Sequence, residues 1–157
     1  MHCQSFILII DQIDLQMAEV EASIKKTKMK YVALESVNAL MDDGVDERAR
    51  LLSDVDNEIH KMCDLRLIDK EIEVCLSSCT SDFMKTKLDI IHFGVLEDLH
   101  EGEGKEEILL IQKKVYTDCL DLSRHKEVTD QIEEEMADLR LKRKILTNAK
   151  DALMNRI

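Results

Sequence analysis

The chain has 157 residues, of which 35% are charged and only 3% aromatic, and it carries a formal net charge of −11 with no proline and four glycines. A globular α/β enzyme needs turns and bulky core side chains, which this composition does not supply, whereas long helices with a narrow apolar seam need neither. The acidic surface also argues against non-specific binding of DNA or RNA, which depends on Lys and Arg side chains that neutralise phosphates. We therefore expect an all-α protein of about the size of one domain.

Residues 1–42 are predicted to form one long helix, because apolar side chains recur there in alternating steps of three and four residues. This heptad spacing gathers them on a single seam that a second helix must cover. It favours an extended coiled coil over a compact antiparallel helical bundle, although both use the same spacing. The polar member Asn38 would favour one register, because a buried amide needs a matching partner. The seam consists of Cys3, Phe6, Ile10, Ile13, Met17, Val20, Ile24, Thr27, Tyr31, Leu34, Asn38 and Met41.

Residues 45–100 are predicted to form the central helices, which begin after a break in the chain. Asp42, Asp43 and Gly44 should end the first helix, with Gly44 in the left-handed conformation that often follows a helix. Asp46 is expected to cap the next helix through its side-chain oxygen. The apolar stripe of that helix is Leu52, Val55, Ile59, Met62, Leu65, Ile68, Ile72, Cys75 and Cys79.

Two further breaks are expected in this part of the chain. The stretch 77–81 has four hydroxyl side chains in five residues. These side chains compete with the helix backbone for hydrogen bonds and favour a kink, with Thr80 or Ser81 as the cap of a further helix. The polar stretch 100–105 contains two glycines and is predicted to form a loop in which the chain reverses direction.

Residues 105–157 are predicted to form a last helix with a less regular seam. Its apolar members are Ile111, Val115, Leu122, Ile132, Met136, Leu139, Leu146, Leu153 and Ile157, and the heptad frame is interrupted by Asp118, His125, Thr129, Arg143 and Lys150. Bases at seam positions repel each other across a homodimer, so we expect Arg143 and Lys150 to meet carboxylates on a different protein. In the alternative, this helix folds back on the second one and the two bases extend outward to solvent.

The five cysteines are an odd number, and the N-terminus lacks the basic region of a secretory signal. The apolar run 6–10 ends at Asp11 and is too short for a signal peptide or a membrane span. We therefore expect reduced thiols and an intracellular protein, in the nucleus or the cytoplasm, that is not secreted.

Two spacings would place possible zinc ligands on one helical face, His60 with Cys63 and Cys75 with Cys79. Neither pair has the CxxC knuckle or the loop glycines typical of structural zinc sites, and the second pair falls on the apolar stripe, where free cysteine packs as a small core residue. His60 and Cys63 are also the only local pair of base and nucleophile, and they lie within a helix without a glycine turn. We predict no enzyme activity, no metal and no cofactor.

The segment 132–146 reads IEEEMADLRLKRKIL, an acidic run, an aliphatic-Asp-Leu-Arg core and a basic run closed by aliphatic residues. This segment, which covers 15 of the 157 residues, resembles a stretch of centromere protein H, a family of helical inner-kinetochore subunits. The resemblance implies a nuclear subunit of a centromere-bound assembly that pairs with a second helical subunit.

We expect the helical regions to form one structural unit, a non-catalytic coiled-coil subunit that assembles a hetero-oligomer through helix–helix contacts, without sequence-specific binding of nucleic acid. A centromere or kinetochore scaffold is one setting, and a microtubule, synaptonemal or vesicle-tethering complex is another. A small cytosolic helical bundle that binds a ligand in its core is the alternative from a different class. The predicted partner interface consists of Ile10, Ile13, Met17, Val20, Ile24, Tyr31, Leu34, Asn38, Met136, Leu139, Arg143, Leu146, Lys150 and Leu153.

Overall fold

Helices account for nearly all of the described chain, as the heptad spacing and the lack of proline predict. The structure is a computed structural model that describes residues 2–156, with side chains from residue 4 onward. The helices are α1 (His2–Asn38), α2 (Val45–Ser78), α3 (Asp82–Asp118), a short 3₁₀ helix η1 (Leu122–Arg124) and α4 (His125–Met154). No strand occurs between residues 2 and 156, and the prediction of an all-α protein is confirmed.

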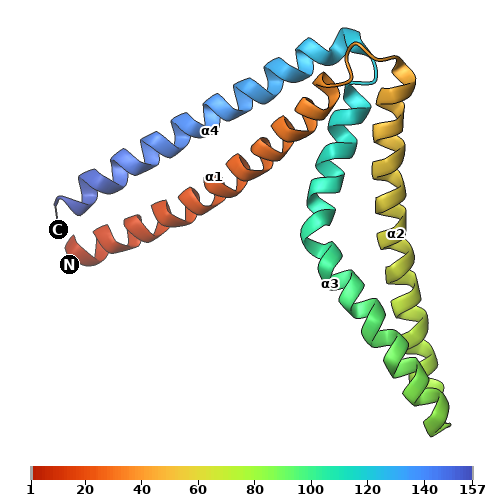
Figure 1. Ribbon diagram of the computed structural model, residues 1–157. Helices are drawn as coiled ribbons and strands as arrows, with labels where there is room; N and C mark the ends of the chain where they lie inside the picture. The colour runs from red at the N-terminus through yellow and green to blue at the C-terminus, as the bar shows by residue number, and fades with distance from the viewer. Residues whose placement is uncertain (1, 157) are drawn as a thin grey trace.

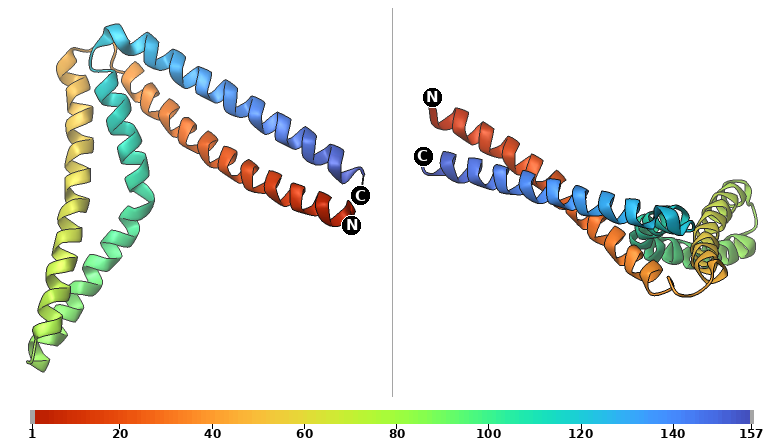
Figure 2. Two further views of the ribbon diagram at one scale, coloured as in Figure 1. Left: turned by 180° about the vertical axis from the view of Figure 1, so that it is seen from behind. Right: turned by 90° about the horizontal axis from the view of Figure 1, so that it is seen from above.

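The helices form two antiparallel pairs, α1 with α4 and α2 with α3, which diverge from a common vertex, so that the molecule has the shape of a V (Figure 1). α1 and α4 lie side by side and form the terminal arm, which ends at the two chain termini. α2 and α3 form the central arm, whose free end is the turn at residues 79–81. Figure 2 shows that both connections between the arms, residues 39–44 and residues 119–124, lie at the vertex.

The main core lies at the vertex, where side chains from all four α-helices meet. Small and β-branched residues predominate in it, because helices that converge on one point leave little volume between them. Ala33 and Val37 of α1 are 0% and 1% exposed. The buried cluster consists of Ala33, Leu34, Val37, Val55, Val115, Tyr116, Cys119, Val128 and Ile132.

The break between α1 and α2 differs in detail from the one predicted. α1 ends at Asn38, and Gly44 occupies the N-cap position of α2 with φ −68° and ψ 169°, an extended conformation rather than a left-handed one. No side chain caps α2, so the cap expected from Asp46 is absent at this helix start. The turn is held instead by buried Arg48, whose Nη1 donates to the carbonyl oxygen of Asp43 at 3.1 Å.

The break predicted in the serine-rich stretch is confirmed and separates α2 from α3. The hydroxyls of Ser77 and Ser78 donate to the carbonyl oxygen of Val74 at 2.7 and 3.2 Å. Such bonds are the competition with the helix backbone that favours an end at this point. Ser81 is the N-cap of α3, and its Oγ accepts the N–H of Met84 at 3.4 Å, as the sequence predicts.

The loop predicted at residues 100–105 is wrong, because α3 continues through it to Asp118. The region 105–157 is therefore two helices rather than one, since its first part belongs to α3. Each interior glycine costs a helix about 1 kcal/mol relative to alanine, but the good helix formers around them and packing on α2 outweigh this cost. Gly102 lies against Met62, whose Cε would be 3.0 Å from an added Cβ, so the glycine allows this close approach.

The chain reverses at residues 119–121, and two features mark this position. Cys119, the C-cap of α3, is 1% exposed within the vertex core, so the end of α3 packs against side chains of the other helices. The side chain of Asp121 accepts the N–H of Ser123 at 3.0 Å and caps η1. This hydrogen bond lowers the pKa of Asp121, because it favours the ionised carboxylate.

Replacing Gly104 with alanine should stabilise the protein by about 1 kcal/mol, because the helix runs through this position and nothing lies within 4 Å of the added Cβ. Gly102→Ala is the matched control, and it should stabilise less because the end of Met62 must move. Urea denaturation followed by circular dichroism measures both. A loss of stability in Gly104→Ala would instead indicate a loop at this position.

Candidate interaction surfaces

The seam predicted on the first helix is the buried face of α1. Asn38, at the end of this face, is exposed, but its Oδ1 accepts a hydrogen bond from His125 Nε2 of α4 at 2.5 Å. Met41 lies in the following turn and is exposed, and the side chain of Cys3 lies outside the described residues. The buried members are Ile10, Ile13, Val20, Ile24, Thr27 and Leu34, and the half-buried members are Phe6, Met17 and Tyr31.

The part of the last predicted seam from Ile132 to Leu153 faces this surface from α4, whereas Ile111 and Val115 lie on α3. Leu122 is exposed in η1, buried Val128 was not among the predicted members, and Ile157 lies outside the described residues. Val20, Ile24 and Met136 form a buried cluster, against which Tyr31, Leu139 and Leu146 pack. The predicted partner interface is therefore the internal contact face between α1 and α4 of one chain. Its α4 members are buried Met136 and half-buried Leu139, Arg143, Leu146, Lys150 and Leu153.

Ion pairs along this contact show its antiparallel register. Lys150 Nζ lies 2.6 Å from Asp14 Oδ1, and Arg143 Nη1 lies 3.4 Å from Glu21 Oε1. A step of seven residues along α1 thus matches a step of seven in the opposite direction along α4. We expected these bases to meet carboxylates on a different protein, but the structure supplies the carboxylates from α1 of the same chain. The alternative of folding back on the second helix also differs from the structure, because α4 packs chiefly on α1.

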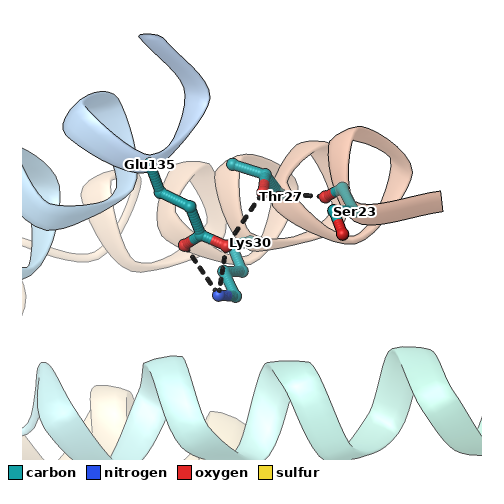
Figure 3. Close-up of polar contacts among 4 residues, drawn as sticks. All are labelled: Ser23, Thr27, Lys30 and Glu135. Carbon is teal, nitrogen blue, oxygen red and sulfur yellow. Dashed lines mark hydrogen bonds and ion pairs between the residues drawn. The ribbon is translucent and has the colours of Figure 1, made fainter. Parts of the chain in front are cut away.

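A buried polar contact lies in the middle of the terminal arm (Figure 3). Thr27 is 0% exposed, and its hydroxyl lies 2.9 Å from the carbonyl oxygen of Ser23 and 3.2 Å from Glu135 Oε1, so two acceptors share its single proton. Lys30 Nζ donates to both carboxylate oxygens of Glu135, at 2.9 and 3.2 Å. A shift of either helix would separate Glu135 from Thr27 and Lys30, so this contact favours one register.

The central arm buries much less of its surface than the terminal arm. On α2, Met62 and Ile72 are buried beyond the vertex, whereas the first buried residue of α3 is Val115. Residues 82–114 of α3 therefore contain no buried residue. Even Leu88 and Val95, which are among the less exposed residues of α3, are only half-buried. One helix covers the other from a single side, and such a hairpin leaves its apolar stripes partly in water.

Polar contacts also join the two helices of the central arm. His92 Nε2 donates to Asp69 Oδ1 at 2.6 Å, and these side chains are only 18% and 20% exposed. Nearer the vertex, the guanidinium of Arg66 is hydrogen-bonded to Glu106 and lowers the pKa of that carboxyl. Polar pairs at partly buried positions restrict the register of two helices, as the contact at Thr27 does in the other arm.

Of the possible metal ligands on α2 that the sequence spacing singled out, His60, Cys63 and Cys75 are exposed. His60 Nδ1 donates to a backbone carbonyl of α2 at 2.7 Å. Within the described residues, one group of three potential ligands has its atoms within 4.8 Å of one another: Asp69, Glu73 and His92. Its histidine and aspartate satisfy each other, so the group acts as an interhelical hydrogen bond.

The described cysteines occupy three different environments, and only Cys75 departs from its prediction. Cys75 is exposed rather than on the buried stripe, because the stripe passes through Ile72 and Leu76 and leaves residue 75 on the side of α2. Cys79 is half-buried at the end of α2. Cys119 is buried in the vertex core, and this burial raises the pKa of its thiol.

Large apolar side chains are exposed along the central arm, outside the stripe that the heptad spacing predicts. Phe83 and Ile90 are seven residues apart and Phe93 follows three later, which places all three on one side of α3. That second, shorter heptad spacing is the sequence signal that could have identified this surface. The most exposed members of the arm, at 59–68% exposure, are Leu67 and Val74 of α2 and Phe83, Ile90 and Phe93 of α3.

A hollow of about 530 Å³ lies on the inside of the V, between α1, α3 and α4. Leu110, Ile111 and Val128 contribute its apolar lining, and charged side chains surround it. Lys26 of α1 and Glu107 of α3 form an ion pair at 3.3 Å across this region, with both side chains more than half exposed. The hollow is therefore open to solvent and bordered by charges of both signs.

Neither a known protein family nor a curated protein nor a solved structure matches this chain. None of the described helices is both long and apolar enough to cross a membrane. The fold and its surfaces define the class: an all-α protein of two antiparallel helix pairs, of which the terminal arm buries a continuous apolar seam and the central arm buries few residues.

Replacing Ile24 with aspartate should destabilise the protein by about 4 kcal/mol, because Ile24 is 3% exposed and the carboxylate would be buried without a partner. Leu15→Asp on the same helix is the matched control; Leu15 is 61% exposed, so a change below about 1 kcal/mol is expected. Chemical denaturation followed by circular dichroism gives both values. Equal effects of the two substitutions would contradict the assignment of Ile24 to the buried face of α1.

Exchanging the charges of Asp14 and Lys150 tests the register of the terminal arm. Each single reversal, Asp14→Lys or Lys150→Asp, should cost about 0.5 kcal/mol at low salt, and the double reversal should recover most of the loss. Glu19→Lys combined with Lys150→Asp is the control, because Glu19 is an exposed acid of α1 that forms no ion pair with any residue whose side chain the structure describes. Additive effects in the Asp14 pair would show that the two side chains do not meet.

Proposed function

We propose that the protein is a non-catalytic helical subunit whose central arm binds other helical subunits of a larger complex. The observation that carries this proposal is the lack of any buried residue in 82–114 of α3, a stretch rich in large apolar side chains. Helices in water derive most of their stability from burial of an apolar face. A long helix with apolar side chains on several sides and none buried has the surface of a subunit that other helices cover.

The terminal arm supports the same proposal in a different way. Its seam is buried by its own chain, so the seam residues are not available to a partner and this arm can serve as a preformed support. A scaffold subunit of a hetero-oligomer needs a stable part and a part that binds partners. The buried seam of the terminal arm and the uncovered apolar side chains of the central arm fit these two roles. The residues considered for catalysis, His60 and Cys63, lie exposed on a helix, which supports a non-catalytic role.

We further propose a centromere-bound assembly in the nucleus as the setting, on the basis of the resemblance of residues 132–146 to centromere protein H. The apolar residues of this segment that face α1 in the terminal arm are Ile132, Met136, Leu139 and Leu146. Charged residues such as Arg140 are exposed to solvent. The apolar part of the resemblance thus serves the fold of the arm. Of its charged part, Glu135 and Arg143 pair with side chains of α1, and the other charged residues are exposed and available for recognition.

Hydrogen exchange on the 157-residue chain tests the proposal for the central arm. In the isolated chain, amides of residues 82–114 should exchange fast and those of residues 20–34 slowly, because local opening of α3 exposes little apolar surface. In the complex isolated from dividing cells, exchange in residues 82–114 should slow at least tenfold, while residues 20–34 serve as the unchanged control. A monomeric chain in cells, or unchanged exchange in α3, would contradict the proposal.

The setting has a separate test. A fluorescent fusion of the chain in dividing cells should form foci that coincide with a centromere marker. A diffuse signal, or a signal on microtubules or vesicles, would overturn the centromeric setting and leave the proposal for the central arm intact.

A further inference from the structure

The outer face of α3, formed by Phe83, Ile90 and Phe93, is the most exposed apolar surface of this helix. These side chains are 68%, 68% and 64% exposed. On a helical wheel they point away from half-buried Leu88 and His92, which mark the side that packs on α2. The chain has only three phenylalanines, and two of them lie on this face.

Exposed aromatic side chains on one helical face are costly in water and are typical of binding surfaces. Aromatic residues dominate the energetics of protein–protein interfaces, because they bury a large rigid area in contact with a partner. The spacing of seven and then three residues matches one seam of a coiled coil, so a helix is the shape of partner that covers all three side chains at once.

The charge of the chain indicates the chemistry of this partner. α2 and α3 each carry nine acidic and five basic side chains, whereas α1 carries five and four and α4 carries seven and six. Most of the net charge of −11 therefore lies on the central arm. A second copy of the chain would bring two strongly acidic arms together, and like charges across an interface oppose association.

Acidic side chains beside the outer face favour a basic partner at its Ile90 and Phe93 end. At the other end, Lys87 Nζ lies 4.6 Å from the centre of the Phe83 ring, so this ring is already paired with a cation of its own chain. Asp89 and Glu97 lie exposed near Ile90 and Phe93 in the sequence of α3 and flank the apolar residues with negative charge. Such a surface complements an apolar stripe bordered by lysine or arginine.

We propose that the outer face of α3 binds an amphipathic helix of a different protein, whose apolar stripe is flanked by lysine and arginine side chains. This inference rests on the proposed function and specifies the partner of the central arm. Its apolar contacts give the affinity, and the basic flanks select against a second copy of this chain.

Two synthetic helical peptides of about four heptads test this chemistry, both with leucine at positions a and d. One carries lysine at e and g, and the other carries glutamate at the same positions. Fluorescence anisotropy with the 157-residue chain should show the lysine peptide binding at least tenfold more tightly than the glutamate peptide, with an affinity that falls as salt rises. Equal binding of the two peptides would overturn the proposal.

The position of the site is tested by the double variant Ile90→Ser with Phe93→Ser, which should weaken binding of the lysine peptide at least tenfold. Leu141→Ser with Ile145→Ser is the matched control, because these exposed apolar residues of α4 are both 57% exposed and lie outside the central arm. Circular dichroism checks that both double variants remain folded. Equal losses in the two double variants would show that the peptide binds the acidic chain without using this face.

Sedimentation of the chain alone tests whether a second copy of the chain covers this face instead. A dimer that dissociates in the double variant Ile90→Ser with Phe93→Ser would assign the face to a second copy and overturn the proposal of a basic partner. The native complex adds a distinguishing result: a photo-crosslinker at residue 90 should attach to a subunit segment rich in lysine and arginine. Crosslinks to an acidic segment would overturn this inference while the proposed function stands, and the lack of any complex would overturn both.

Discussion

The antiparallel contact between α1 and α4 is the constraint on which the rest of the structure depends. It joins segments that are far apart in the sequence, since Thr27 and Glu135 are separated by 108 residues. A slip of one heptad along this contact would displace one helix by about 10 Å relative to the other. Leu34 of α1 and Val128 of α4 could then no longer meet in the vertex core. The register of the terminal arm therefore determines where the central hairpin begins and ends.

The two arms use the same kind of polar contact but differ in apolar support. Thr27 with Glu135 in one arm, and Asp69 with His92 in the other, place a hydrogen bond at a partly or fully buried position. Burial of a side chain such as Ile24 contributes about 1.5–3 kcal/mol, whereas an exposed ion pair contributes at most about 1 kcal/mol. The ion pairs of the central arm thus cannot replace the buried apolar residues that it lacks. This difference is the physical basis for assigning scaffold and binding roles to separate arms.

The sequence predicts the terminal arm well and the central arm less well, for identifiable reasons. The side chains of the heptad seam from Phe6 to Leu34 are all at least half-buried. The sequence predicts this correctly because an unbroken heptad spacing places the apolar residues on one face of one helix. The serine-rich break was also predictable, since Ser81 caps α3 through a local hydrogen bond. The glycines at 102 and 104 were misleading, because packing of Gly102 on Met62 is a tertiary contact.

The reversal at residues 119–121 is a break in the helices that the sequence did not predict, whereas the glycines at 102 and 104 predicted a break that is absent. Neither glycine nor proline marks it, and the burial of Cys119 among residues of the four α-helices exists only once the fold has formed. The partner of Arg143 and Lys150 could not be read from spacing either. A base at a seam position needs a carboxylate nearby, but the spacing does not say which helix carries Asp14 and Glu21.

The angle between the arms follows from the vertex core rather than from contacts across the V. Lys26 and Glu107 are both more than half exposed, so their ion pair contributes at most about 1 kcal/mol to holding the arms. A change of angle would instead have to expose residues such as Tyr116 and Ile132, which are 5% and 4% exposed among close-packed neighbours. Packed cores resist such deformation, so the vertex core opposes a change in the angle between the arms. A helix held on the outer face of α3 would consequently keep its direction relative to the terminal arm, and the core in which Cys119 is buried would set the geometry of the complex.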